Sequence, residues 1–379
     1  MSRPSILNER HLSLGKGILW GGRTIASWAA LNLGRRLRKK PPLPSVLTVY
    51  VTYRCNLRCR ICGIWKQPPD EAHPDLSLDG LETIIADPFF RRVRMINLNG
   101  GEPNLRPDLP GIAAMLIRRL PRLRALSVNS NGLPPETTLR NARTIAGLCR
   151  EKGIRFSVSL SLHGTGRLFD DIVGLPGAYE NVMASFSGLK ALRRDDPIHL
   201  SANCVMTGLN LSELDEMPAW SEREGIPVNF TLGEVRERFN NLDMASAVLT
   251  EGDRRKKMVA FLRSLASRKR VYRQHSLRYA RLAEMLERDA PRALSCHYFM
   301  GGAILGADGH LYYCKKCPSL GNVLERSARE IYFDPENIAF RKNGLEKSIC
   351  PSCPPNTFNQ MEASRDLHKI LAFLLFSRR

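Results

Sequence analysis

Eight of the ten cysteines in this 379-residue chain fall into two close groups, and thiols grouped in this way are typical of metal ligation. Gaps of two and three residues keep several of the sulfur atoms close together in space. A framework of disulfides is expected only in a much shorter secreted chain. The pattern therefore predicts metal binding in a reducing cytoplasm. The grouped residues are Cys55, Cys59 and Cys62, followed by Cys296, Cys314, Cys317, Cys350 and Cys353.

The first group has the spacing C-x3-C-x2-C and directly follows a predicted strand. A structural zinc site requires four closed ligands, and no fourth cysteine or histidine follows at ligand spacing. A cubane iron–sulfur cluster held by three cysteines leaves one iron with an open position. That iron can bind a chelating substrate and pass it an electron. The alternative, three buried cysteines without a metal, does not explain the spacing.

The elements that must position this loop alternate between strand and helix from residue 46 to residue 235. Such alternation predicts parallel strands joined by crossover helices, as a sheet or a barrel. The predicted strands are 46–53, 95–99, 125–130, 155–162, 198–207 and 227–233. The predicted helices are 77–87, 109–120, 136–151, 178–193 and 212–224.

Several of these strands alternate between apolar and polar residues, whereas fully covered parallel strands are usually apolar throughout. In the fourth strand, Phe156 and Val158 face one side, while Ser157 and Ser159 face the other. If the apolar side packs on helices, the polar side lines the lumen, which should then hold a polar ligand. An open antiparallel sheet with one wet face is the alternative, and it fits poorly because a helix separates each pair of strands.

Four motifs in this region resemble those of the radical S-adenosylmethionine (SAM) superfamily. They are the C-x3-C-x2-C loop, G-G-E-P at 100–103, N-S-N-G at 129–132 and S-L-S-L-H-G at 159–164. The resemblance implies an α/β fold, a partial (βα)6 TIM-like barrel. It also implies a [4Fe–4S] cluster whose open iron binds SAM, and reductive cleavage of SAM to a 5′-deoxyadenosyl radical that abstracts hydrogen from a substrate. The chain departs from the family pattern at His163, where aspartate is usual, and at Ile61, where an aromatic residue is common.

The resemblance also implies which residues bind SAM. Paired glycines let the backbone approach a ligand closely, and polar residues of the later strands face the same lumen. The implied cofactor-binding residues are Gly100, Gly101, Glu102, Pro103, Asn129, Asn131, Ser159, Ser161 and Asn203. The sequence does not select a catalytic acid or base. The candidates are His163, His199, Glu234 and Tyr179, because they border the predicted lumen.

The second group of cysteines resembles the SPASM/twitch extension of radical SAM enzymes. A full SPASM domain holds two auxiliary clusters and needs more than five cysteines. The count therefore favours a twitch-like domain with one second [4Fe–4S] cluster on Cys296, Cys314, Cys350 and Cys353, with Cys317 spare or replacing one of them. A four-cysteine zinc site built from the two C-x2-C pairs is the alternative, and it leaves Cys296 unexplained.

The flanking segments are basic or apolar, and the formal charge of the whole chain is +20. We expect five parts: a basic amphipathic segment at 1–45, the barrel at 46–235, a helical linker at 236–290, the iron–sulfur domain at 291–356, and an apolar helix at 357–379. The two ends favour a cytoplasmic protein with peripheral contact at the inner face of the membrane; a helix that caps the domain is the alternative. Nucleic acid is not favoured as a partner, because the basic stretches lack interleaved aromatic residues.

The predicted activity is that of a radical SAM oxidoreductase. We expect a net oxidation or other modification of a small molecule, sugar or lipid-linked compound, with an auxiliary cluster able to accept the electron left after hydrogen abstraction. An external electron donor such as flavodoxin or ferredoxin is then required. The alternatives are a maturase of ribosomally made peptides, disfavoured by the lack of a peptide-recognition domain ahead of the barrel, an RNA-modifying radical enzyme, and a non-enzymatic iron–sulfur or zinc protein.

Overall fold

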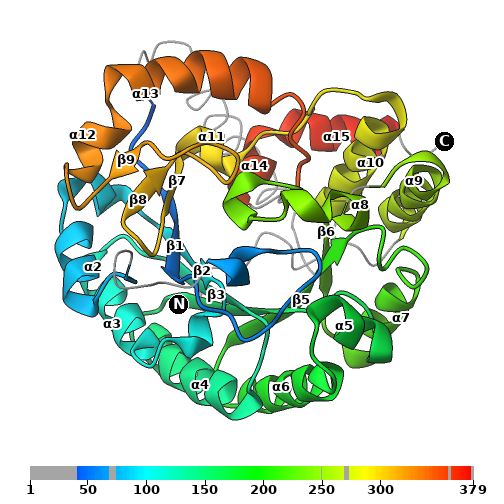
Figure 1. Ribbon diagram of the computed structural model, residues 1–379, viewed down its shortest axis with the longest axis horizontal. Helices are drawn as coiled ribbons and strands as arrows, with labels where there is room; N and C mark the ends of the chain where they lie inside the picture. The colour runs from blue at the N-terminus through cyan, green and yellow to red at the C-terminus, as the bar shows by residue number, and fades with distance from the viewer. Residues whose placement is uncertain (1–40, 68–73, 249, 269–272, 357–359, 377–379) are drawn as a thin grey trace, which may run out of the picture.

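A single curved sheet with helices on its outer side dominates the computed structural model (Figure 1), which describes residues 41–67, 74–248, 250–268, 273–356 and 360–376. The sheet has nine strands in the order β6-β5-β4-β3-β2-β1-β7-β8-β9. Strands β1 to β6 pair in parallel, each with its neighbour in the sequence. The predicted partial (βα)6 barrel is confirmed, and it is open because β6 and β9 are edge strands.

The ends of the six parallel strands lie within one residue of the predicted ends. They are β1 (Val46–Thr52), β2 (Met95–Gly100), β3 (Ala125–Ser130), β4 (Arg155–Ser161), β5 (Ile198–Met206) and β6 (Val228–Leu232). The five predicted helices are α2 (Leu78–Ile85), α3 (Leu109–Arg119), α4 (Pro135–Glu151), α6 (Ala178–Leu192) and α7 (Glu216–Glu224). The short helix α5 (Gly166–Val173) was not predicted.

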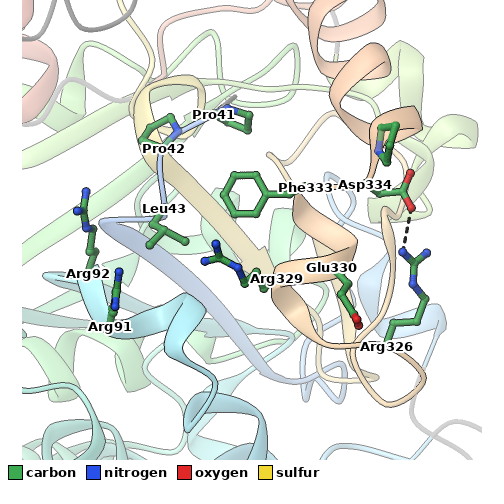
Figure 2. Close-up of a pocket in the computed structure, with 11 residues that line it drawn as sticks. Pro41, Pro42, Leu43, Arg91, Arg92, Arg326, Arg329, Glu330, Phe333 and Asp334 are labelled. Atoms are coloured by element: carbon green, nitrogen blue, oxygen red, sulfur yellow. Dashed lines mark hydrogen bonds and ion pairs between the residues drawn. The ribbon is translucent and has the colours of Figure 1, made fainter. Parts of the chain in front are cut away.

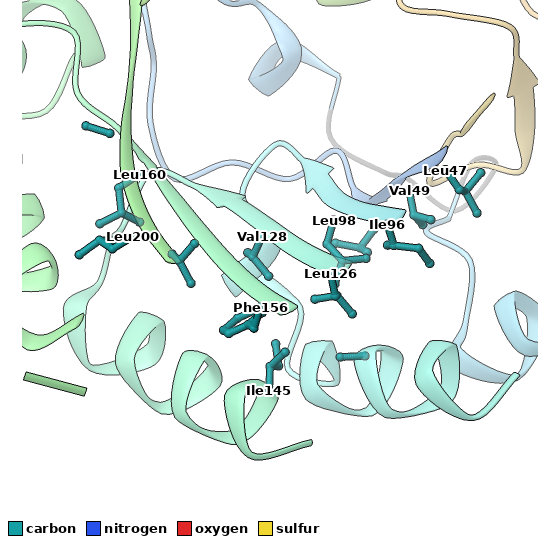
Figure 3. Close-up of a cluster of buried hydrophobic side chains, with 14 of the residues drawn as sticks. Leu47, Val49, Ile96, Leu98, Leu126, Val128, Ile145, Phe156, Leu160 and Leu200 are labelled. Carbon is teal, nitrogen blue, oxygen red and sulfur yellow. The ribbon is translucent and has the colours of Figure 1, made fainter. Parts of the chain in front are cut away.

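The barrel strands bury one face and leave the other face polar and partly open. In β4 the apolar residues Phe156, Val158 and Leu160 are buried, and Figure 3 shows Phe156 close to Ile145 of α4. The serines between them are half-buried on the opposite face. The register of the sheet places polar residues of neighbouring strands side by side in rows, as predicted for the lumen. One row is Thr48, Asn97, Ser127, Ser157 and His199.

The cysteine-rich part of the chain continues the barrel sheet and does not build a sheet of its own. Strand β7 (Gly302–Leu305) pairs in parallel with β1, and β8 (His310–Tyr312) and β9 (Gly321–Asn322) follow as antiparallel strands. The segment at 291–356 is therefore joined by backbone hydrogen bonds to the strand that leads into the first cysteine group. Figure 1 shows β7 and β8 beside β1.

The remaining elements are mostly helical. They are α8 (Ala245–Val248), α9 (Gly252–Ser267), α10 (Arg273–Arg288), α11 (His297–Gly301), α12 (Ala328–Tyr332), α13 (Pro335–Phe340), the π-helix η6 (Arg341–Ile349), α14 (Gln360–Arg365) and α15 (Leu367–Phe376). Five short 3-10 turns are η1 (Ile64–Lys66), η2 (Pro88–Arg92), η3 (Pro103–Leu105), η4 (Glu237–Phe239) and η5 (Leu242–Met244). Helices α9 and α10 account for much of the predicted helical linker, and Phe230 of β6 donates its backbone N–H to the Tyr279 hydroxyl of α10 (3.2 Å).

The predicted amphipathic segment at 1–45 lies almost entirely outside the described residues. Among the helices that are described, none combines the length and the apolar character that crossing a membrane requires.

Candidate metal centres

The first cysteine group lies on the loop after β1, at the carboxyl ends of the parallel strands, which is the end where βα barrels hold their active sites. Cys55, Cys59 and Cys62 are free thiols, and each is half-buried. The Cys62 N–H donates to the carbonyl of Cys59 (3.3 Å), so a tight turn joins the second and third thiols. The three sulfur-bearing residues therefore share one short loop at the mouth of the barrel.

The backbone of this loop is tied to the end of α5. The N–H groups of Arg58 and Arg60 donate to the carbonyls of Val173 (3.0 Å) and Ile172 (2.8 Å). Leu57, between the first two cysteines, is buried in the main core. The helix that the sequence did not predict is thus one of the supports of the cysteine loop.

The three thiols are costly to ionise in the protein when nothing is bound to them. Burial raises the pKa of Cys55 to about 11, and it raises the pKa values of Cys59 and Cys62 as well. The neighbouring thiols Cys62 and Cys55 raise the pKa of Cys59 further. A bound metal offsets this cost, because a coordinating thiol is deprotonated. No three metal-ligating side chains of the described residues converge on the position of a single ion. A cubane offers each cysteine a different iron, so three cysteines on one short loop can each hold one corner of the cluster.

The paired glycines at the end of β2 are required by a close approach of the chain to itself. A Cβ on Gly101 would lie 2.6 Å from the carbonyl carbon of Arg54 and would overlap its oxygen. The N–H groups of Gly101 and Glu102 donate to the carbonyls of Thr52 (2.9 Å) and Arg54 (2.8 Å). The sequence interpretation assigned this close approach to a ligand. In the structure, the glycines already serve to hold the segment that leads into Cys55.

Glu102 is a fully buried carboxylate that joins the ends of β2 and β3. Its Oε1 accepts hydrogen bonds from the backbone N–H and side-chain amide of Asn104 (both 3.0 Å) and from the Ser130 hydroxyl (2.8 Å). Its Oε2 accepts from the Asn131 N–H (2.6 Å). Burial raises the pKa of Glu102, and these hydrogen bonds oppose that rise. Glu102 is therefore a positioning residue, and Pro103 beside it is also buried.

Asn131 connects the third strand to the cysteine loop. Its side-chain amide donates to Oδ1 of Asn56 (2.7 Å), and its Oδ1 accepts from the Leu133 N–H (2.8 Å). Asn56, which follows Cys55, in turn donates to the Leu133 carbonyl (3.1 Å). Two of the predicted cofactor residues, Glu102 and Asn131, thus act together on the backbone around the first cysteine.

The other predicted cofactor residues lie on the polar face of the sheet. Ser159, Ser161 and Asn203 are half-buried, and Ser161 lies beside Asn203 in the register of β4 and β5. Asn129 is exposed, and its amide donates to Oδ1 of Asn99 on β2 (2.7 Å). These side chains offer hydrogen-bonding groups to a polar ligand in the lumen.

The four candidates for an acid or base are not equivalent. His163 is buried, its Nδ1 accepts from the Val205 N–H (3.2 Å), and burial lowers its pKa to about 4, so it is neutral and turned into the protein. His199 lies at the amino end of β5, away from the end of the sheet that carries the cysteines, whereas Tyr179 lies in the first turn of the outer helix α6. Only Glu234 of the four follows the carboxyl end of its strand and also pairs with the second cysteine loop, through the Lys316 ammonium (3.1 Å).

The second cysteine group favours the predicted set of four ligands. Burial raises the pKa of Cys350 to about 12, and the nearby thiols of Cys296, Cys314 and Cys353 raise it further. The Cys353 N–H donates to the carbonyl of Cys350 (3.2 Å). Cys317 is buried in the apolar core, donates its S–H to the Cys314 carbonyl (3.2 Å) and accepts the Cys314 N–H (3.2 Å). We propose Cys296, Cys314, Cys350 and Cys353 as ligands, with Cys317 as the spare thiol.

Residues 234–241, which we name the bridging segment, contact both cysteine loops. The Gly63 N–H donates to the Phe239 carbonyl (2.8 Å), and the Asn241 amide donates to the Ile61 carbonyl (3.1 Å), beside Cys62. At the other end, Glu234 pairs with Lys316 between Cys314 and Cys317. The sequence interpretation named only Glu234 here. The V-R-E-R sequence at 235–238, directly after the sixth strand, is the pattern that could have pointed to the other residues of this segment.

A separate cavity of about 850 Å³ lies at the other end of the sheet (Figure 2). It is lined by Pro41 to Leu43, which precede β1, and by Arg91 and Arg92, which precede β2. These residues adjoin the amino ends of the strands, so the cavity is remote from the cysteine loop. Arg326 and Arg329 also line it, but Arg326 is paired with Asp334 (2.9 Å).

Comparison with known families agrees with this arrangement. Residues 49–220 match the radical SAM superfamily, and residues 296–354 match the SPASM iron–sulfur cluster-binding domain. The chain belongs to the radical SAM superfamily and carries a C-terminal SPASM-type domain. It is therefore an enzyme. The radical SAM domain implies SAM and a [4Fe–4S] cluster as cofactors, and the SPASM domain implies auxiliary iron–sulfur clusters. The zinc alternative for the second cysteine group and the non-enzymatic alternative are not supported.

Individual curated relatives match about half of the chain. The chain is 34% identical over 212 residues to a GTP 3′,8-cyclase of Acidothermus cellulolyticus, covering 52% of each chain. It is 31% identical over 191 residues to a pre-heme d1 synthase of Dinoroseobacter shibae, covering 50% of this chain and 43% of that one. The chain thus spans about half the length of these curated relatives. SuiB of Streptococcus suis bound to S-adenosylmethionine has the same fold, with a TM-score of 0.56 at 13% identity over 93% of this chain and 80% of that one.

Proposed function

We propose that this enzyme carries out a net oxidation or other radical modification of a polar small molecule, a sugar or a lipid-linked compound. The observation that carries the proposal is the bridging segment, which contacts the loop of Cys62 and the loop of Cys314 from the end of one strand. When bound, the [4Fe–4S] cluster and SAM supply a 5′-deoxyadenosyl radical that abstracts hydrogen, and an auxiliary cluster supplies an acceptor for the remaining electron.

The residues of the chain have three separate tasks in this proposal. Cys55, Cys59 and Cys62 hold the first cluster, and α5 and Asn131 fix the loop that carries them. The rows of polar side chains in the lumen orient a polar substrate, as the half-buried Ser159 and Ser161 indicate. Glu102 uses its acceptors on the protein itself, so it positions the loop and does not act as a base.

Polar rows in the lumen favour a small or lipid-linked compound as the substrate. The names of the two curated relatives, a GTP cyclase and a heme-precursor synthase, also refer to small molecules. A second SuiB structure, bound to the precursor peptide SuiA, has a TM-score of 0.50 at 13% identity over 90% of this chain and 75% of that one, and supports the fold alone. A flavodoxin- or ferredoxin-type donor is proposed as the source of the reducing electron.

The proposal is tested by metal analysis and by SAM cleavage under anaerobic conditions. A variant with Cys55, Cys59 and Cys62 all changed to Ala is expected to make no 5′-deoxyadenosine and to keep about four irons and four sulfides at the second site. Cys149→Ala is the matched control, because Cys149 is buried alone in α4 and ligates nothing in the proposal. Wild-type protein that forms no 5′-deoxyadenosine with a reductant would overturn the proposal. A triple variant that retains no sulfide would remove the auxiliary electron acceptor.

A further inference from the structure

We propose that Arg236 and Arg238 of the bridging segment form a subsite for an anionic group of the substrate, a carboxylate or a phosphate. The inference rests on the proposed function, because it names the substrate class of the same site. Both arginines follow β6 directly, and Arg238 lies in the short turn η4. Neither belonged to the predicted cofactor or catalytic residues.

Arg238 is a half-buried residue whose guanidinium nitrogens are enclosed, with the Tyr53 hydroxyl near them and no carboxylate paired with them among the described residues. Its guanidinium carbon lies 3.8 Å from the ring centroid of Tyr312 and 4.6 Å from that of Tyr50, so two aromatic rings hold the group in place. Its Nε, Nη1 and Nη2 are all buried, and none has a hydrogen-bond partner within the described part of the chain. A buried guanidinium without partners is costly. An anion supplied by a ligand removes that cost.

Arg236 presents a second, partly unpaired guanidinium on the same segment. Its side chain is 9% exposed, and its Nη2 pairs with Glu234. Its Nε and Nη1 are buried and, as far as the described residues extend, have no partner. Glu234 is also shared with Lys316 (3.1 Å), so one carboxylate faces two cations before Arg238 is counted. The site therefore has an excess of positive charge.

A further carboxylate in this region, Asp308, does not pair with either arginine among the described residues. Asp308 accepts a hydrogen bond from the Tyr53 hydroxyl (3.3 Å), and its Oδ2 lies 3.2 Å from Nδ1 of His310. Burial lowers the pKa of Arg236, and the nearby thiols of Cys353 and Cys314 oppose that fall. The sulfur ligands of a cluster can offset part of the positive charge of the arginines from a distance. They do not match the planar fork of donors that arginine offers, which fits the paired oxygens of a carboxylate or phosphate.

The place of the subsite in the fold agrees with a role in holding substrate. Tyr50, on which Arg238 stacks, belongs to a small apolar cluster that Cys296 and Cys314 also contact. The same segment reaches the Cys62 loop through Phe239 and Asn241. An anion bound here would therefore be held by the segment that contacts both cysteine loops. A charged group fixed at that point orients the remainder of the substrate for hydrogen abstraction.

Calorimetric titration of the anaerobically reconstituted enzyme tests the subsite, with inorganic phosphate and succinate as separate probes. We expect one equivalent of at least one probe to bind the wild type. Arg238→Gln is expected to weaken that binding roughly 10- to 100-fold, as for the loss of a charge-assisted bidentate pair. Arg254→Gln is the matched control, since Arg254 is exposed on α9 and its removal changes the net charge equally. Its Kd should stay within about twofold of wild type.

Two results overturn the inference: wild type that binds neither probe, or Arg238→Gln that binds as tightly as wild type. Iron and sulfide content shows whether Arg238→Gln has lost its fold. If it has, Arg236→Gln and Arg238→Lys are titrated in its stead, and binding as tight as that of the wild type again overturns the inference. Phosphate binding without succinate binding, or the reverse, identifies the anion. Formation of 5′-deoxyadenosine by the wild type is measured in parallel. If the wild type forms no 5′-deoxyadenosine but still binds the anion, the proposed function is refuted and the subsite is still supported.

Discussion

Replacing Gly101 by alanine is expected to push the segment after β1 away from the segment after β2. The added Cβ would lie 2.6 Å from the Arg54 carbonyl carbon, whereas carbon atoms pack at about 3.5–4.0 Å. The two backbones must therefore separate by about 1 Å. That movement stretches two hydrogen bonds, from Gly101 to Thr52 (2.9 Å) and from Glu102 to Arg54 (2.8 Å).

The size of the effect follows from those two bonds. A backbone hydrogen bond contributes about 1 kcal/mol net, and a buried group left without its partner costs about 1–3 kcal/mol. Gly101→Ala should therefore lower the free energy of unfolding by about 2–5 kcal/mol. Because Arg54 immediately precedes Cys55, the same movement displaces the first thiol. A displacement of about 1 Å in a catalytic constellation lowers a rate on the order of 100-fold.

Urea unfolding, iron content and 5′-deoxyadenosine formation, all measured anaerobically, check this prediction. Gly147→Ala is the control, because it makes the same chemical change inside α4, where nothing lies within 4 Å of the new Cβ. Removing a glycine from a helix interior should raise the free energy of unfolding by about 0.5–1 kcal/mol. If Gly101→Ala unfolds at the same urea concentration as wild type and retains full iron, the steric reasoning is wrong.

Three further outcomes are expected. Glu102→Gln replaces one acceptor oxygen by an NH2 group, which then faces another donor, most simply the Asn131 N–H. The free energy of unfolding should fall by about 2 kcal/mol. An unchanged urea midpoint would contradict the buried network. Cys317→Ser should keep the iron content of wild type, whereas Cys350→Ser should lose about four irons, and equal losses would disprove the ligand set. Since burial lowers the pKa of His163 from 6.5 to about 4, the unfolded state alone gains this proton between those values. The stability contributed by neutral His163 is complete above pH 6.5 and is lost as the pH falls toward 4, so wild type should lose more stability on acidification than His163→Gln; equal pH slopes in urea unfolding would refute it.

Local patterns predicted most of the barrel because its strands carry their own signal. The alternation in β4 and β5 reflects one face against helices and one toward the lumen, and it located the strand ends closely. Helix α5 was missed because it is short and follows the His163-Gly164 motif, which the sequence alone assigns to a loop. The pairing of β7 with β1 joins residues more than 250 positions apart. No local pattern specifies such a partner, so the shared sheet was not predicted.

The part of the candidate site that depends on the spacing of residues in the sequence was predictable. The part that depends on which side chains become buried on folding was not. The C-x3-C-x2-C motif indicates a cluster by itself, because three thiols that close in sequence must be close in space. Arg236 and Arg238 gave no comparable signal, since they are two of 57 basic residues and most such residues lie on a solvated surface. Their meaning depends on buried nitrogen atoms without partners and on the rings of Tyr50 and Tyr312. Those facts exist only in the folded chain.

The pairing of β7 with β1 has a further consequence for the stability of the barrel. Without β7, β1 would become an edge strand and would present unpaired N–H and C=O groups beside the segment that leads to Cys55. An exposed edge of this kind is a template for pairing with other chains. The fully buried residues of β1, Val46–Thr52, would be uncovered at the same time. The C-terminal strands thus protect the barrel from aggregation, and a shortened chain that ends before residue 302 would lose that protection together with Cys314, Cys317, Cys350 and Cys353.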